Sequence, residues 1–174
     1  MSTHQALRAA VRDVIDFPQP GIVFKDITPI LANAELFHSS INLLCATAGG
    51  VKIDKVVGID ARGFIFAAAV ADRLGAGFVP VRKTGKLPWK TRQISYALEY
   101  GEATVELHED AVQPGEAILL VDDLLATGGT AAAAVKLLDE LGARLVGISF
   151  LIELTFLHGR SKLIPHPVYS ILSY

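Results

Sequence analysis

The strongest constraint on the fold is a strand–loop–helix pattern that occurs twice along the chain. The apolar run Ala117–Val121 is followed by a polar loop with two glycines and by a helical pattern over Thr130–Leu141. The same order occurs earlier, with the strand KVVGI from Lys55 and a helix over Phe64–Leu74. A short strand follows each helix, at GFVPV and at Leu145–Ile152. Strands joined through helices pair in parallel, so we predict an α/β fold with a mostly parallel sheet flanked by helices.

Local signals predict the N-terminal elements. Ser2 and Gln5 have the spacing of a capping box and open an amphipathic helix whose apolar positions continue to Val14. Three prolines and a glycine within Phe17–Pro29 end this helix and predict an ordered, extended loop. A second helix is predicted over Glu35–Ala48, because two glycines follow it.

An antiparallel hairpin is predicted between the two strand–loop–helix units. The segments SYALEY and ATVELH flank Gly101 and Glu102. A glycine followed by a polar residue suits a two-residue II′ turn. The pattern therefore predicts two antiparallel strands that interrupt the α/β core.

Composition limits the number of domains and the compartment. The chain has 174 residues, half of them apolar and a fifth charged, which is typical of one globular domain over residues 1–174. A net charge of −2 gives no general attraction to nucleic acid or anionic lipid. Cys45 is the only cysteine, and the chain has neither a secretory signal nor an uncharged apolar run of bilayer length. We therefore expect a cytoplasmic protein with no membrane or nucleic-acid partner.

The segment VDDLLATGGT, Val121–Thr130, carries the clearest chemical signal. Two adjacent carboxylates, Asp122 and Asp123, follow an apolar strand, and a turn with two glycines then opens a helix. Free N–H groups at a helix N-terminus attract anions, and glycines let a phosphate approach the backbone closely. The carboxylates would repel that phosphate unless they face sugar hydroxyls, a metal ion or a developing cation. A ribose 5-phosphate meets both demands.

Well-known nucleotide-binding loops differ from this segment. It has no lysine, which a Walker A loop requires, and Gly75–Gly77 lacks the third glycine of a dinucleotide-binding fingerprint. The remaining alternative is structural, with Asp122 and Asp123 forming a turn that caps the next helix.

VDDLLATGGT resembles the phosphoribosyl pyrophosphate (PRPP) motif of the type I phosphoribosyltransferases, in the form typical of the adenine-specific enzymes. FPQPGIVFKDITP, GIDARGF, VRKTGKLP and YALEYG also occur in the order and approximate spacing of that family. The resemblance thus covers nearly the whole chain. It implies the sheet and helices predicted above, a small N-terminal hood (residues 1–34) over the base and a mobile flap (residues 82–107).

The resemblance also assigns roles to the residues of two loops. Asp122 and Asp123 would approach the ribose hydroxyls and stabilise developing positive charge. One loop would bind the 5-phosphate through Ala126, Thr127, Gly128, Gly129 and Thr130. The other would bind pyrophosphate through Asp60, Ala61 and Arg62, with a cis peptide bond between Asp60 and Ala61.

A group of cations follows the second strand: Arg82, Lys83, Lys86, Lys90 and Arg92, with no carboxylate among them. Arg82 and Lys86 are the candidates to compensate the charge of the departing pyrophosphate. The rival interpretation is a nucleic-acid patch, which the acidic remainder of the chain and the single nearby aromatic, Trp89, disfavour. Lys90 and Arg92 suit a solvated loop, and the roles of residues 89–95 stay open.

Adenine contacts are implied by the resemblance at two separate segments. Val23, Phe24 and Lys25 match positions that hold the base, with Phe24 stacking on its ring. Leu154 matches a residue on the other face of the purine, and its alternative is a core leucine at a strand end.

The flap supplies two further candidates. Glu99 matches a glutamate that comes down over the substrates and could assist proton transfer at the imidazole edge of the purine. Tyr100 would help to cover the site. The alternative for Glu99 is an acidic residue on a solvated hairpin face.

The activity that the resemblance implies is purine salvage, in which the 5-phosphoribosyl group passes from PRPP to adenine and gives AMP and pyrophosphate. Mg²⁺ would be the cofactor, held mostly by substrate oxygens and water, so no protein ligand is named. Small-molecule substrates and a homodimer are expected. Two alternatives stay open: an enzyme that uses another purine base, and a PRPP-sensing regulator without catalysis.

Overall fold

The computed structural model describes residues 2–97 and 101–174. The chain forms two compact units, residues 1–43 and 44–174. The boundary falls within helix α3 (Ala34–Ala46).

The smaller unit contains two short helices and a hairpin. Its elements in chain order are α1 (Thr3–Ala10), β1 (Arg12–Ile15), β2 (Val23–Asp26), α2 (Thr28–Ala32) and the first turns of α3. The predicted capping box is confirmed, because the Gln5 N–H donates to Ser2 Oγ at 3.3 Å and the Ser2 N–H donates to Gln5 Oε1 at 2.8 Å. The predicted second helix is confirmed as α3, within two residues at its end.

Two predictions for this unit are wrong in detail. The first helix ends at Ala10, and Val14 lies in β1, directly opposite Phe24 of β2. The segment predicted as an extended loop therefore contains the second strand of an antiparallel hairpin. The ring of Phe17 packs edge-to-face on that of Phe24, with centroids 5.2 Å apart. This aromatic contact joins the hairpin loop to β2 and stabilises the hairpin, and helical periodicity does not reveal it.

The larger unit is a seven-stranded sheet with helices on its faces. Its strand order is β5-β6-β4-β3-β7-β8-β9, with parallel pairing from β4 through β9 and antiparallel pairing of β6 with β4 and β5. The strands are β3 (Lys55–Ile59), β4 (Gly77–Lys83), β5 (Thr91–Ala97), β6 (Glu102–His108), β7 (Ala117–Leu125), β8 (Arg144–Glu153) and β9 (Val168–Ser173). The predicted fold class is confirmed.

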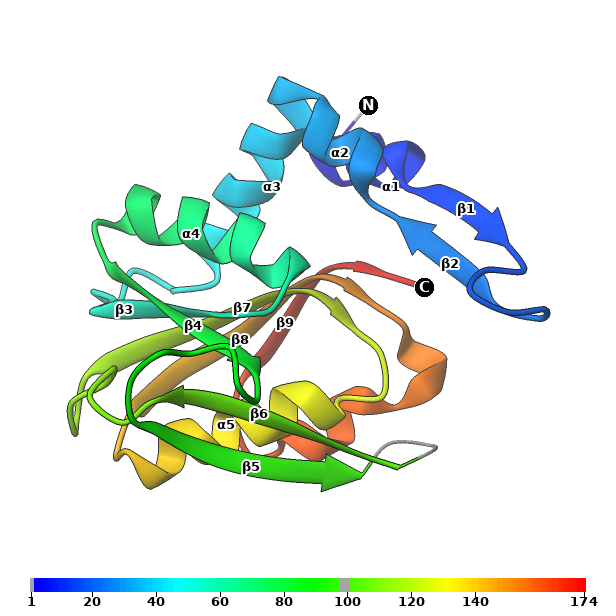
Figure 1. Ribbon diagram of the computed structural model, residues 1–174. Coiled ribbons are helices and arrows are strands. Elements are labelled where there is room, and N and C mark those ends of the chain that lie inside the picture. Colours follow the sequence, from blue (N-terminus) through cyan, green and yellow to red (C-terminus); the bar gives the residue numbers. More distant parts are fainter. Residues whose placement is uncertain (1, 98–100) are drawn as a thin grey trace. The chain divides into compact units, whose positions relative to one another are not determined.

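Helices cover both faces of this sheet. Helix α4 (Arg62–Leu74) lies on one face and α5 (Gly129–Glu140) on the other (Figure 1). Two 3₁₀ turns, η1 (Thr155–Leu157) and η2 (Gly159–Leu163), follow β8 and lead to the edge strand β9. Strand β9 was not predicted, because the segment before it carries prolines and shows no repeat of the strand–loop–helix pattern.

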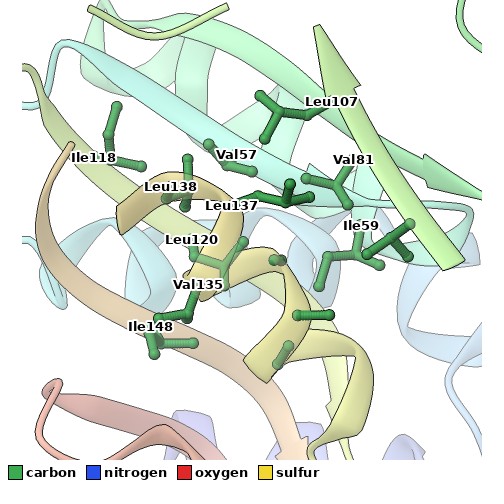
Figure 2. Close-up of a cluster of buried hydrophobic side chains, with 14 of the residues drawn as sticks. Val57, Ile59, Val81, Leu107, Ile118, Leu120, Val135, Leu137, Leu138 and Ile148 are labelled. Carbon is green, nitrogen blue, oxygen red and sulfur yellow. The ribbon is translucent and has the colours of Figure 1, made fainter. Parts of the chain in front are cut away.

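The main hydrophobic cluster lies between the sheet and α5. Val135, Leu137 and Leu138 of α5 pack with sheet residues such as Leu120 and Ile148 (Figure 2). Leu120, Leu137, Leu138 and Ile148 have no exposed surface. Burial of this apolar stripe holds α5 against the sheet and fixes the position of its N-terminus.

The predicted antiparallel hairpin is confirmed as β5 and β6, but its predicted turn is wrong. Ala97 pairs with Glu102, so Glu102 is the first residue of β6 rather than part of a two-residue turn. Residues 98–100 lie outside the described residues.

No helix in the described part of the chain is long and apolar enough to cross a membrane.

Candidate active site

A cleft of about 390 Å³ lies at the carboxyl ends of β3 and β7, where α/β sheets commonly bind ligands. It is lined by Ile59–Arg62 from the end of β3 and the start of α4, and by Asp122–Ala131 from β7, the next loop and α5. The structure therefore brings together the two loops that the sequence predicted as phosphate-binding.

The loop after β3 leads directly into α4. The predicted cis peptide bond between Asp60 and Ala61 is confirmed. Arg62 is the first residue of α4, and Gly63 follows it. A Cβ atom on Gly63 would collide with the Asp122 carboxylate, so only glycine permits α4 to approach β7 this closely.

The acidic pair lies within β7, which continues to Leu125 instead of ending at the predicted Val121. Asp123 is buried, and its Oδ2 lies 2.6 Å from Arg62 Nε. Its backbone N–H donates to Asp122 Oδ1 at 2.9 Å. Arg62 is therefore held by one of the two carboxylates that line the cleft.

The environment of Asp122 disfavours its ionised form. Burial raises the pKa of the Asp122 carboxyl well above its usual value, and the neighbouring charge of Asp123 raises it further. The positive charge of Arg62 acts in the opposite direction but does not cancel the rise. Positive charge that develops in the cleft would favour ionisation of this carboxyl.

The predicted phosphate loop, Ala126–Thr130, ends at the N-terminus of α5. Gly128 is the N-cap and has φ of 78°, a conformation that favours glycine. A Cβ atom there would collide with the Gly159 carbonyl oxygen. Because α5 is 12 residues long and firmly packed, its free N–H groups are held in fixed positions at the cleft, as an anion-binding site would require.

Strand β5 of the flap contacts this loop through a residue that the sequence did not single out. The Tyr96 hydroxyl lies 2.9 Å from the Thr130 hydroxyl, and either group can be the donor. A Cβ atom on Gly129 would lie 3.1 Å from the Tyr96 ring. No sequence signal distinguishes Tyr96 from other flap residues, and the same holds for Gly159.

Two of the five predicted cations contact Asp60, a residue that lines the cleft. Arg82 Nε lies 3.1 Å from Asp60 Oδ2, and Lys86 Nζ lies 3.5 Å from the same oxygen. Lys83, Lys90 and Arg92 are exposed. For Lys90 and Arg92 this agrees with the predicted solvated loop. No acidic residue lies among the cations in the sequence, but the fold brings the Asp60 carboxylate to Arg82 and Lys86, and the Glu106 carboxylate to the backbone N–H of Lys86.

The predicted adenine-contacting residues lie in different units. Val23, Phe24 and Lys25 belong to β2 of the 1–43 unit, where Lys25 Nζ lies 2.6 Å from Asp13 Oδ1 on the paired strand. Leu154 belongs to the 44–174 unit, and its N–H donates to the Leu125 carbonyl at 2.9 Å. Their contacts to a base stay predictions. Glu99 and Tyr100 fall outside the described residues.

The described part of the chain contains no group of three His, Cys, Asp or Glu side chains that could hold a metal ion. The cleft does offer carboxylate oxygens from Asp122 and Asp123. Carboxylate oxygens and substrate phosphates are the usual ligands of Mg²⁺, so the donor set fits this ion when substrate supplies the other oxygens.

Comparisons with known proteins agree with this geometry. A family model described as "Phosphoribosyl transferase domain" matches residues 26–170. The adenine phosphoribosyltransferase of Acidothermus cellulolyticus is 57% identical over 168 residues, which cover 97% of this chain and 95% of that protein.

Solved structures give the same result. The crystal structure of adenine phosphoribosyltransferase from Thermoanaerobacter pseudethanolicus has a TM-score of 0.95 and 48% identity, covering 98% of this chain and 99% of that one. The Saccharomyces cerevisiae enzyme, solved with D-2,5-dideoxy-2,5-imino-altritol 1,6-bisphosphate and adenine, has a TM-score of 0.92 and 43% identity, with 97% and 98% covered.

Proposed function

Because the chain belongs to the adenine phosphoribosyltransferase family of type I phosphoribosyltransferases, we propose that it transfers the 5-phosphoribosyl group of PRPP to adenine. The products are AMP and pyrophosphate, and the biological role is purine salvage. The similarity supports this assignment, because it covers nearly the whole of this chain and of its relatives. The adenine in the yeast complex supports it as well.

The observation that carries the proposal is the content of one cleft. It combines the N-terminus of α5, a pair of carboxylates and a loop to which two cations are bound. PRPP has a terminal phosphate, ribose hydroxyls and a pyrophosphate, in that order. We assign the 5-phosphate to residues 126–130, the ribose hydroxyls to Asp122 and Asp123, and the pyrophosphate to residues 60–62.

The chemistry is a substitution at the anomeric carbon of the ribose. The bond from this carbon to the pyrophosphate oxygen breaks, a bond to adenine N9 forms, and the N9 proton is lost. Positive charge develops on the ribose, where Asp122 and Asp123 supply negative charge. Negative charge develops on the pyrophosphate, where Arg62, Arg82 and Lys86 supply positive charge. The protein therefore acts mainly by positioning and electrostatics.

We further infer that Mg²⁺ accompanies PRPP. It would be held mostly by phosphate oxygens and water, Asp122 and Asp123 are the carboxylates of the cleft that could contribute, and it would neutralise part of the pyrophosphate charge. A homodimer and a cytoplasmic, reducing location are also part of the proposal. The family resemblance supports the first, and the single cysteine, Cys45, supports the second.

Base selectivity tests the proposal. We expect the protein, with PRPP and Mg²⁺, to convert adenine to AMP and to leave guanine, hypoxanthine and xanthine unconverted at any useful rate. A site that hydrogen-bonds one base rejects another whose groups leave its donors unpaired. The measurement is chromatographic product analysis with each base supplied alone. Comparable turnover of guanine or hypoxanthine would assign the enzyme to another base, and no nucleotide from any base would favour the regulator.

A further inference from the structure

We propose that Glu106 is a positioning residue, which holds the loop after β4 so that Lys86 and Arg82 face the pyrophosphate of PRPP. The proposal rests on the proposed function. Glu106 lies in β6 and has only 2% of its surface exposed. A carboxylate is buried in this way only when its charge is paired or hydrogen-bonded, so its partners show what it organises.

Hydrogen-bond donors surround the Glu106 carboxylate. The backbone N–H groups of Lys86 and Leu87 both donate to Oε1, each at 3.0 Å. Thr91 Oγ1 donates to Oε2 at 3.2 Å and Gln93 Nε2 donates to it at 3.1 Å. One oxygen therefore holds the loop that carries Lys86, while the other is anchored to β5.

The electrostatics of this contact keep Glu106 ionised. Burial raises the pKa of its carboxyl, but hydrogen bonds from the backbone N–H groups of Leu87, Gly85 and Lys86 and from Thr91 lower it by more. The net pKa is below the usual value for glutamate. Successive N–H groups that converge on one anion form a nest, and the anion fixes the local backbone conformation.

The loop held by Glu106 places both cations. Arg82 lies directly opposite Glu106 in the β4–β6 pairing, and its Nη1 donates to the Lys86 carbonyl at 3.2 Å. The peptide group before Lys86 is therefore held by Glu106, and the peptide group after it by both Glu106 and Arg82. From these positions the Lys86 ammonium and the Arg82 guanidinium both reach Asp60, which lines the cleft.

A positioning role predicts an effect that depends on the ligand. The contacts of Glu106 connect to the cations assigned to pyrophosphate. The loop at residues 126–130 instead leads into α5, packs against Gly159 and is contacted by the Tyr96 hydroxyl. Loss of Glu106 should weaken binding of PRPP and pyrophosphate and spare AMP. A residue needed only for folding would change all three ligands together or change stability alone.

The test compares Glu106→Gln with the control Glu109→Gln, which changes an exposed carboxylate just after β6. Glutamine keeps the length of the side chain but removes the charge and turns one acceptor into a donor that faces Thr91 and Gln93. We expect KM for PRPP, and KM for pyrophosphate in the reverse reaction, to rise about tenfold, as for loss of one charge-assisted hydrogen bond. Calorimetric Kd for AMP should stay within about threefold, and the control should match the parent.

A double-mutant cycle identifies the path of the effect. If Glu106 acts through Lys86, the variant that combines Glu106→Gln and Lys86→Ala should have no higher KM for PRPP than the worse single variant. If the fold-increases in KM of the two single variants multiply in the combined variant, the proposal is overturned, since the two residues would then affect PRPP binding independently. An unchanged KM in Glu106→Gln, or equal weakening of PRPP and AMP, would also overturn it.

A milder variant keeps the proposal testable if Glu106→Gln does not fold. Gln93→Leu removes one donor from Oε2 at an exposed position. In this variant we expect faster amide hydrogen exchange in residues 84–90 and a higher KM for PRPP, with Kd for AMP unchanged. If the exchange rates and the KM both equal those of the parent, the role of Glu106 is refuted.

A parent that makes AMP while these variants behave normally refutes only the role of Glu106. A parent that neither binds PRPP nor makes AMP refutes the proposed function.

Discussion

The combined variant Asp122→Asn, Asp123→Asn is expected to lose about 10²–10³-fold in kcat, as when a fixed charge-stabilising group is removed from an active site. Both side chains line the cleft, and no other carboxylate of β7 can replace their negative charge beside the ribose. Asparagine keeps the shape of each side chain and removes its charge. The measurement is the steady-state rate of AMP formation with saturating adenine and PRPP.

The stability of the same site separates catalysis from folding. The folded-state pKa of Asp122 is raised, so its contribution to stability is full below the unfolded pKa of about 3.8 and is lost as pH rises through the folded value. At neutral pH the single variant Asp122→Asn should thus be at least as stable as the parent in urea unfolding. Asp110→Asn, at an exposed position, is the control for both measurements.

Two outcomes would contradict this account of the acidic pair. Turnover of the combined variant within about threefold of the parent would remove the pair from the charge-stabilising role. An unfolded combined variant at neutral pH would show that the pair is needed for folding, but not as the predicted turn and cap, because both residues lie in β7 and Gly128 is the N-cap of α5.

Glu99→Gln is expected to lower kcat by about 10²-fold or more and to leave KM for PRPP little changed. Attack by adenine N9 makes the purine more acidic, so a carboxylate at its imidazole edge can accept the proton. Glutamine has nearly the same shape and cannot accept it. The measurement is kcat for AMP formation, with KM for PRPP from the same data.

The structure decides the control for Glu99. Glu106, on the same hairpin, is unsuitable because its carboxylate is buried and accepts several hydrogen bonds. Glu102 is exposed at the start of β6 and is the matched control. If Glu99→Gln and Glu102→Gln both stay within about threefold of the parent, proton transfer by Glu99 is excluded. The flap would then act by excluding water and retaining substrates.

Much of the 44–174 unit could be predicted because its signals are local. The apolar runs at β3 and β7, the glycines after their helices and the carboxylates before Gly128 are each readable within a few residues. A parallel sheet then brings the ends of β3 and β7 together, which is why the Asp60–Arg62 and Asp122–Thr130 loops line one cleft.

What the sequence did not reveal depends on contacts between distant residues. Val14 lies in β1 because it pairs with Phe24, although its spacing also suits the preceding helix. No sequence signal distinguished Glu106 from the other carboxylates of the hairpin, yet it is buried under a loop some 20 residues away in sequence. Tyr96 reaches Thr130 from another element in the same way. Tertiary pairing overrides local pattern at all three places.

The most direct test of the central claim is a crystal structure of the protein with AMP bound. We expect the phosphate against the backbone N–H groups of Thr127–Thr130, and the ribose hydroxyls within hydrogen-bond distance of Asp122 or Asp123. The base should then contact Leu154 or the hood residues Val23–Lys25. AMP whose phosphate lies away from the N-terminus of α5, for example in the separate cavity lined by Arg160 and His166, would contradict the assignment of this cleft.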